Sequence, residues 1–173
     1  MITDLVQIRT LAEKKRDENF RFRRFMKSRD HSDRILRRIA EGIQEQIDCT
    51  ACANCCKTST TAISERDIDR LARHLRISRE RFLADYTMPD DEGALSLRFT
   101  PEAGCVFLEG NLCSVYEARP KACRDFPHLA LGTHSLGGRV ASIGRWVSLC
   151  PIVYNALERY KKRLGYHPPT PRP

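Results

Sequence analysis

Four cysteines occupy the stretch CTACANCC, residues 49–56, and four more follow later in the chain. The full set is Cys49, Cys52, Cys55, Cys56, Cys105, Cys113, Cys123 and Cys150. Thiols this dense can form disulfides, carry out thiol–disulfide exchange, or bind a metal. The C-x2-C spacing lets the chain turn so that both sulfurs face one point, where backbone N–H groups can donate to the thiolates. The rest of the sequence has to discriminate between these chemistries.

The expected compartment favours a metal. The N-terminal stretch MITDLVQIRTLAEKKRDENF has acids near its start and no apolar run of signal-peptide length. No segment approaches the ~20 apolar residues of a membrane span. We therefore expect a cytoplasmic protein without membrane association, in which thiols stay reduced. A thiol–disulfide oxidoreductase is also disfavoured, because it needs one C-x-x-C beside a βαβ pattern and would leave the other cysteines unused.

The overlapping C-x2-C motifs predict one set of ligands. Cys49, Cys52 and Cys55 form the opening of a ferredoxin-like C-x2-C-x2-C pattern, which needs a remote fourth ligand. Cys150 is a candidate because Pro151 follows it, as a proline follows the remote cysteine in the bacterial pattern.

Cys56 predicts a second set. Adjacent side chains in an extended or turning chain point to different sides, so we expect Cys55 and Cys56 to serve different centres. Cys56 would then join Cys105, Cys113 and Cys123. One polynuclear centre with shared sulfurs is the alternative.

Cysteine-only ligation suits both zinc and iron–sulfur clusters. Zinc sites usually combine two separate C-x2–4-C knuckles, whereas this chain has one such region. The C-x2-C-x2-C run favours an iron–sulfur cluster, with zinc as the alternative and one or two centres in the protein. Two arginines, Arg119 and Arg124, flank Cys123. They either lower the pKa of the thiol or cover the surface and pair with Asp125 and Glu117.

A helical N-terminal segment precedes the cysteines. Leu5, Ile8, Leu11 and Ala12 follow a helical period, as do Leu36, Ile39, Ile43 and Ile47. Between them lies RFRRFMKSR, residues 21–29, with Phe22, Phe25 and Met26 among basic residues. This stretch is either a charged helical arm packed on the protein or a surface that binds nucleic acid or an acidic partner.

The segments after the cluster predict short helices and hairpins. Ser64 with Asp67 forms a capping box before one helix, and Ser78 caps a second. ALSLRFT alternates like a strand, and CVFLEGNLCSVY predicts two strands around Gly110. A further hairpin is expected to turn near residues 137–138, and a final helix to stop at Gly165.

These elements together predict an α+β fold, a small irregular cysteine-rich domain stapled by metal. The expected division is a basic helical arm at 1–48, a cysteine-cluster domain at 49–165 and a Pro-rich tail at 166–173.

Composition and motifs leave enzymatic activity open. The formal net charge is +8, which suggests a nucleic-acid partner. Metal-bound cysteines are thiolates, however, so part of this surplus balances them and nucleic acid is not favoured. No P-loop, dinucleotide-binding, zinc-protease or nucleophile-elbow motif is present. His128 and His134 are candidates for an accessory ligand or proton relay, although a loop histidine is more often solvated.

The chain resembles a known family. CTACANCC, CVFLEGNLCSVYEARPKACRDFP and the late Cys150 are similar to the CxxCxxCC cysteine-cluster family, often called YkgJ-like. The resemblance covers about Cys49 to Cys150 and includes the Y-x-x-R-P-x-x-C-R-x-F-P pattern at 116–127. It implies a zinc- or iron-chelating domain, often labelled an iron–sulfur protein. Some relatives belong to flagellin lysine N-methylases, which implies an accessory role there as one alternative.

The function expected from the sequence is therefore metal binding, with an electron-transfer or accessory role to a protein or redox partner. The alternative is a zinc-stapled interaction module that uses its basic arm to bind nucleic acid or protein.

Overall fold

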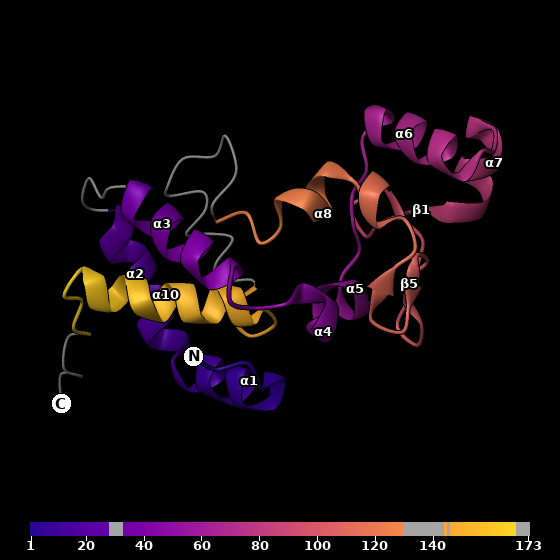
Figure 1. Cartoon of the computed structure of the whole chain (residues 1–173). Helices are drawn as coiled ribbons and strands as arrows, with labels where there is room; N and C mark the ends of the chain where they lie inside the picture. The colour runs from indigo at the N-terminus through magenta and orange to yellow at the C-terminus, as the bar shows by residue number, and fades with distance from the viewer. Residues whose placement is uncertain (28–32, 130–143, 145, 169–173) are drawn as a thin grey trace. The chain divides into compact units, whose positions relative to one another are not determined.

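The computed structural model describes residues 1–27, 33–129, 144 and 146–168 (Figure 1). The chain forms two compact units. The first, which we call the helical unit, combines Met1–Asp48 with Pro127–Pro173, and the second, the cysteine unit, is Cys49–Phe126. Residues 127–165, which were expected in the cysteine-cluster domain, group with the N-terminal helices in this division. The expected arm, domain and tail stay a prediction.

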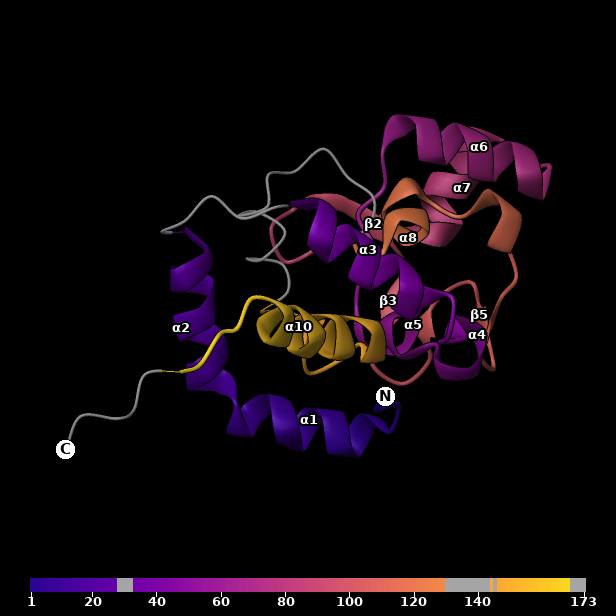
Figure 2. The same ribbon diagram turned by 60° about the vertical axis from the view of Figure 1, so that its left-hand side comes forward.

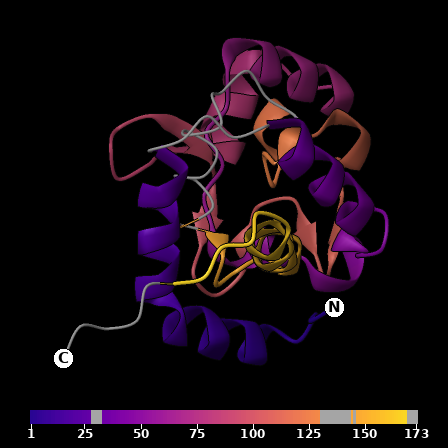
Figure 3. The same cartoon turned by 90° about the vertical axis from the view of Figure 1, so that its left-hand side faces the viewer.

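The helical unit is organised around its C-terminal helix. Its helices are α1 (Leu5–Lys14), α2 (Arg16–Lys27), α3 (Asp33–Gln44) and α10 (Pro151–Arg163). α10 lies alongside α3 and contacts α1 (Figure 2). Seen nearly end-on, α10 is flanked by the N-terminal helices (Figure 3). Helix α10 buries residues almost all round its first two turns, which explains why it forms the centre of this unit.

Half of the residues in the predicted apolar stripes of this unit are buried, and the other half are partly exposed. Ile8, Leu36 and Ile43 have no exposed surface. Phe22 and Met26, from the basic stretch, are also buried. Phe22 and Met26 therefore serve the helical core, while Arg21 and Arg24 are exposed.

A buried lysine ties α10 to α2. The side chain of Lys161 is 5% exposed, and its ammonium binds Glu18 at 2.7 Å and Glu158 at 2.8 Å. Asn19 also accepts from it. Glu158 is further paired with Lys15 from the N-terminal helices. Because a buried charge is costly unless it is paired, this cluster fixes one register between the two helices.

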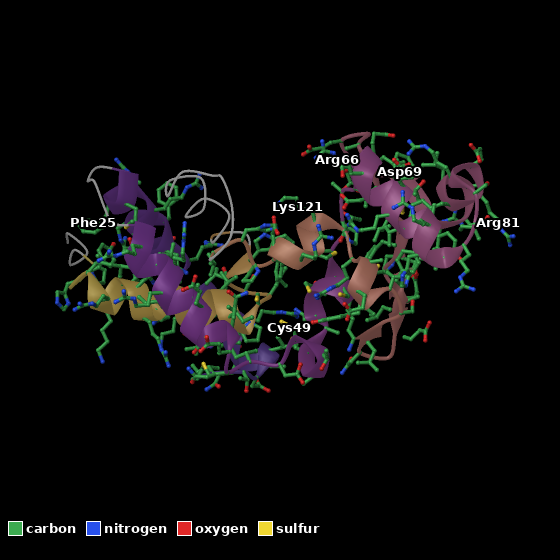
Figure 4. All side chains as sticks on the ribbon, turned by 45° about the horizontal axis from the view of Figure 1, so that its top comes forward. Phe25, Cys49, Arg66, Asp69, Arg81 and Lys121 are labelled. Carbon is green, nitrogen blue, oxygen red and sulfur yellow. The ribbon has the colours of Figure 1, made fainter. Side chains whose placement is uncertain are left out.

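The cysteine unit begins with α4 and α5, described below, and continues into α6 (Glu65–Leu75) and α7 (Arg79–Tyr86). Ser64 and Asp67 form the predicted capping box, and Ser78 caps α7. Arg66, Asp69 and Arg81 project from the outer side of this helix pair (Figure 4). The unit has a core of its own. Its buried members are Ile68, Leu71, Ala72, Phe82, Leu97, Phe107, Val115 and Ala118.

Three antiparallel strand pairs complete the cysteine unit within the described residues. They are β1 (Thr87–Pro89) with β2 (Leu95–Leu97), β3 (Phe99–Thr100) with β4 (Gly104–Cys105), and β5 (Leu108–Glu109) with β6 (Leu112–Cys113). The hairpin around Gly110 is confirmed, whereas ALSLRFT divides into β2 and β3. A 3-10 turn, η1 (Tyr116–Ala118), and α8 (Lys121–Asp125) follow.

The fold is thus α+β with short strand pairs, as predicted. The hairpin expected near residues 137–138 lies outside the described residues, as does His134. α10 ends one residue before Leu164, and Gly165 follows with a φ of +60°, as its predicted role in stopping the helix requires. Among the described residues, no helix has the length and apolar character needed to span a membrane.

Removing the buried charge of Lys161 tests the organisation of the helical unit. We expect Lys161→Ala to lower the free energy of unfolding by about 2–3 kcal/mol, because Glu18 and Glu158 lose their shared cation. Urea unfolding followed by circular dichroism measures this. Lys162→Ala, at the exposed neighbouring position, serves as control and should change stability by less than about 0.5 kcal/mol. Equal losses in both variants would contradict the role given to Lys161.

Candidate metal centre

The clustered cysteines lie on two very short helices. α4 covers Cys49–Cys52 and α5 covers Asn54–Thr58. Between them Ala53 is buried and has a φ of +48°, in the left-handed region. This residue breaks the helix and turns the chain, so that α5 starts in a new direction. Cys49 is exposed at the start of α4 (labelled in Figure 4), while Cys52, Cys55 and Cys56 are half-buried.

Gly104, the first residue of β4, lets this strand approach α5 closely. Gly104 has a φ of +77°, and a Cβ placed on it would lie 2.7 Å from the carbonyl oxygen of Cys56. The same Cβ would lie 3.1 Å from the Cα of Lys57. Only glycine allows this approach of two backbones. It places Cys105, the next residue in the chain, beside the end of the CTACANCC stretch.

Two turns direct backbone N–H groups at sulfur. The N–H of Phe107 donates to Cys105, and the N–H of Val115 donates to Cys113. In both turns the donor stands two residues after the cysteine, and its side chain is buried in the core of the unit. The two turns are also joined, since the N–H of Ser114 donates to the carbonyl of Phe107 at 2.9 Å. Such donors stabilise thiolates and orient them, as expected of metal ligands.

The fourth sulfur of this group comes from α8. The thiol of Cys123 donates to the hydroxyl oxygen of Thr61 at 3.7 Å, and the contact with Thr61 lowers the pKa of Cys123 against the effect of burial. Thr61 is itself held by the N–H of Leu97, which donates to its carbonyl at 2.9 Å. The strand β2 therefore positions the hydroxyl that contacts Cys123.

Four thiols of the cysteine unit act on one another electrostatically. The charge of Cys56 acts on Cys105, Cys113 and Cys123, and Cys113 and Cys123 also act on Cys105. Burial, together with the charge of the neighbouring thiols, raises the pKa of Cys105 and of Cys123 to about 11. Burial likewise raises the pKa of Cys113. A bound cation would reverse these effects, because it stabilises all four thiolates together.

Cys56 differs from the other three thiols. The hydrogen bond with Cys55, with the charges of Arg119 and Lys57, lowers the pKa of Cys56 to about 7 against the opposing effect of burial. The sulfurs of Cys55 and Cys56 are 3.9 Å apart. This corrects our geometric premise that adjacent cysteines point to different sides, because on the short helix α5 they do not. Two thiolates on one tetrahedral zinc ion stand about 3.8 Å apart, so this spacing also allows the alternative of one polynuclear centre that both cysteines share.

Arg119 is a cation whose charge acts on three of these thiols. Its charge lowers the pKa of Cys56, Cys113 and Cys123 against the other effects that act on them. Its guanidinium lies over the ring of Tyr116, 3.4 Å from the ring centroid. Asp125 pairs with Lys121. Of the two readings given to Arg119 from the sequence, the structure favours a role beside sulfur.

A clamp built on α6 holds the loop that carries Cys123. Asp67 is buried, and its carboxylate accepts the N–H of Lys121 at 3.0 Å and the guanidinium of Arg70 at 2.5 Å. Arg70 in turn donates to the carbonyls of Ala118, at 3.3 Å, and Arg119, at 2.7 Å. The capping box of α6 thus also fixes the segment between η1 and α8.

A second polar link joins the two halves of the cysteine unit. Asn111, in the turn between β5 and β6, donates to the carbonyl of Ala51 at 3.2 Å and accepts from the ammonium of Lys57 at 2.5 Å. The hairpin that carries Cys113 is therefore hydrogen-bonded to the CTACANCC stretch.

The predicted ligand sets stand as follows. Cys56, Cys105, Cys113 and Cys123 form one neighbourhood, which we call the thiol tetrad. Cys49, Cys52 and Cys55 lie on the adjoining helices α4 and α5. Cys150 is 7% exposed at the start of α10 and belongs to the helical unit, so its part in a centre stays a prediction. His128 precedes α10 in the same unit.

The residues of the tetrad fit a thiophilic metal in their donor chemistry. The ligand atoms are four sulfurs, and two of them, those of Cys105 and Cys113, accept hydrogen bonds from backbone N–H groups. Within the described residues, no three His, Cys, Asp or Glu side chains are already arranged around one point as a metal would require. Metal binding at the tetrad would therefore require side chains to rotate toward a common centre.

Comparison with known families agrees with this chemistry. A family model described as "CxxCxxCC: Putative zinc- or iron-chelating domain" matches residues 48–151. The chain belongs to this family. The match covers the whole cysteine unit and extends to Cys150. Searches of curated proteins and of solved structures found no match.

Several supporting residues were not identified from the sequence. Thr61, Arg70 and Gly104 carried no pattern that singled them out, and Asn111 was expected only as a residue of the turn that it forms with Gly110. One signal was present but unused. In CVF and CSV an apolar residue stands two positions after each cysteine. This residue buries its side chain and donates its backbone N–H to the sulfur.

Substitution of Gly104 tests the close approach that joins α5 to β4. We expect Gly104→Ala to lower the free energy of unfolding by about 2 kcal/mol more than Gly93→Ala, and to lower the metal content. Gly93 has a φ of +81° and open space where a Cβ would stand, so the control carries the backbone strain without the clash. Chemical unfolding and metal analysis measure the two effects. Equal losses in both variants would show that the approach is unimportant.

The clamp of Asp67 predicts a particular dependence on pH. Burial acts to raise its pKa, but the hydrogen bonds from Ser64, Lys121 and Arg70 outweigh burial and lower the pKa to about 2. Its unfolded value is about 3.9. The stabilisation is therefore present above about pH 4 and is lost as the pH falls through about 2. We expect Asp67→Asn to cost about 2 kcal/mol at pH 7, with a difference from wild type that shrinks between pH 4 and 2.

The control for this experiment is Asp85→Asn. Asp85 forms an exposed pair with Arg81, so its loss should cost less than about 0.5 kcal/mol. Unfolding in urea at a series of pH values gives the comparison. A difference between wild type and Asp67→Asn that stays constant down to pH 2 would contradict the role of the carboxylate.

Proposed function

We propose that the cysteine unit binds a metal centre through the thiol tetrad, Cys56, Cys105, Cys113 and Cys123. The observation that supports this proposal is that four thiols, carried by α5, β4, β6 and α8, act on one another electrostatically in a unit where Gly104 brings β4 against α5. Two of these sulfurs, those of Cys105 and Cys113, also accept backbone hydrogen bonds. Bringing four thiols together without a cation is unfavourable once they ionise. A bound metal would replace this repulsion with metal–sulfur bonds that link α5 to the strands and to α8.

The cysteines of α4 and α5 supply a further set of ligands. Cys49, Cys52 and Cys55 keep the C-x2-C-x2-C spacing, which favours an iron–sulfur cluster over zinc. When bound, such a cluster supplies one-electron redox chemistry. In the neighbouring tetrad, the N–H groups of Phe107 and Val115 would stabilise the thiolates of Cys105 and Cys113, and the charge of Arg119 would stabilise that of Cys56. The exposure of Cys49 would leave an edge of the site open to a redox partner.

A structural zinc site is the second candidate, and one observation favours it. Cys105 and Cys113 pack directly against the apolar core, next to Phe107 and Val115. A closed four-thiolate zinc in this position would add binding energy to the folding of the unit and would have no open coordination site. The protein would then serve as an interaction module, without electron transfer.

Metal and sulfide analysis of protein isolated under anaerobic conditions discriminates between the two candidates. An iron–sulfur protein contains iron with inorganic sulfide and shows a redox-linked colour change. A colourless, zinc-loaded and sulfide-free protein would end the electron-transfer proposal and leave the zinc site. Protein that contains neither metal would overturn both.

Two cysteine variants test whether the ligands form separate sets. Cys113→Ser removes a ligand from the tetrad, and Cys52→Ser removes one from the C-x2-C-x2-C run. With separate centres, each variant should lose one centre and keep the other, as measured by metal stoichiometry. If both variants lose all metal, the centre is one polynuclear site. Full retention of metal by Cys113→Ser would exclude the tetrad as a ligand set.

A further inference from the structure

The helical unit contains a pocket that no cysteine lines. Its volume is about 560 Å³, within the range of small-molecule sites. The lining residues are Arg21, Arg24, Phe25, Leu164, Gly165, Tyr166 and His167. They come from α2 and from the segment directly after α10. All of them belong to the helical unit.

The pocket carries concentrated positive charge. Arg21 and Arg24 stand three residues apart on α2, which places them on neighbouring turns of one helix face. Both are exposed, and within the part of the chain that the structure describes neither guanidinium has an acidic partner. His167 adds an exposed imidazole at the same site. Two unpaired guanidiniums in one pocket are well suited to an anion, which each can bind in bidentate fashion.

The same pocket contains aromatic surface. The rings of Phe25 and Tyr166 lie 5.2 Å apart between centroids, and Figure 4 labels Phe25 on α2. Phe22 packs beneath them, 4.9 Å from the ring of Tyr166, and is itself buried. The aromatic wall is thus anchored in the core and does not depend on a ligand for its position. Aromatic rings held in this way offer a stacking surface for a planar ligand.

The hydroxyl of Tyr166, in the aromatic wall, is a polar group whose hydrogen bonding is unsatisfied within the described part of the chain. It is buried, and no hydrogen-bond partner for it is found among the described residues. The charge of Arg21 acts on this hydroxyl, so the two groups are neighbours. A buried hydroxyl without a hydrogen-bond partner is unfavourable. An acceptor oxygen drawn into the pocket by Arg21 would satisfy this donor after a small rearrangement.

From these observations we infer that the pocket binds a small ligand in which a phosphate monoester is attached to a planar ring. The two guanidiniums match the charge of about −1.5 to −2 that such a phosphate carries at pH 7. The rings of Phe25 and Tyr166 contact the planar part. The site takes ligands of nucleotide size and acts independently of metal binding.

This inference gives the arginines of the basic stretch a defined role. Phe22 and Met26 are buried and unavailable to a partner, whereas Arg21 and Arg24 face the pocket. Recognition therefore requires both the anion and the ring at one place. A long polyanion that recognises only positive charge would bind the arginines at positions 21, 23 and 24 of α2 equally well.

Adenosine 5′-monophosphate is a suitable probe, with adenosine and inorganic phosphate as its separated halves. Isothermal titration of the full-length protein should give saturable binding of the monophosphate, about tenfold or more tighter than either half. Arg21→Gln and Arg24→Gln should each weaken binding by about tenfold, as expected for loss of a charge-assisted hydrogen bond. Arg23→Gln removes the same charge from α2 outside the pocket and should change affinity by less than about twofold.

The outcomes separate the possibilities. No saturable binding, or phosphate binding as tightly as the monophosphate, would overturn the inference, the second result by showing that the rings contribute nothing. Equal weakening in Arg21→Gln and Arg23→Gln would also overturn it, because the effect would then be one of net charge. Circular dichroism of each variant verifies that α2 remains folded, and metal content should be the same in all three.

Discussion

The cysteine unit depends on the contact between the backbones of Gly104 and Cys56. A side chain at Gly104 would occupy the space of the Cys56 carbonyl, so the absence of a Cβ lets β4 meet α5. This contact converts a separation of 48 residues in sequence into a shared neighbourhood of sulfurs, from Cys56 to Cys105. Asn111 and Lys57 reinforce the same junction with hydrogen bonds. The chemistry of the site therefore rests on a steric condition that no cysteine itself supplies.

The second constraint is that the core and the thiol tetrad share residues. Phe107 and Val115 bury their side chains in the apolar core while their N–H groups donate to Cys105 and Cys113. Phe107 also stacks on Tyr86, 5.1 Å between ring centroids, and Tyr86 stacks on Phe82. The backbone positions of Cys105 and Cys113 are thus fixed from the apolar side, and their thiols have to rotate toward a metal. Metal binding and packing should consequently be cooperative, since loss of either loosens the other.

The sequence predicted local structure well because local signals determine it. Ser64 with Asp67, Ser78, and the turn at Gly110 each act within a few residues, and each lies where it was placed. Long-range relations were less accessible. The packing of α10 with the N-terminal helices follows from buried faces on segments more than a hundred residues apart, and the clamp from Asp67 to Lys121 spans 54 residues. The premise about Cys55 and Cys56 failed because it assumed an extended chain where a short helix forms.

The central claim is that sulfur atoms of the tetrad are the ligands of a bound metal. X-ray absorption spectroscopy at the metal edge, on protein as isolated, tests this claim most directly. The account predicts a nearest coordination shell made of sulfur at about 2.3 Å, with a sulfur removed from that shell in Cys113→Ser. A shell dominated by nitrogen or oxygen, or a sulfur shell that Cys113→Ser leaves unchanged, would contradict it.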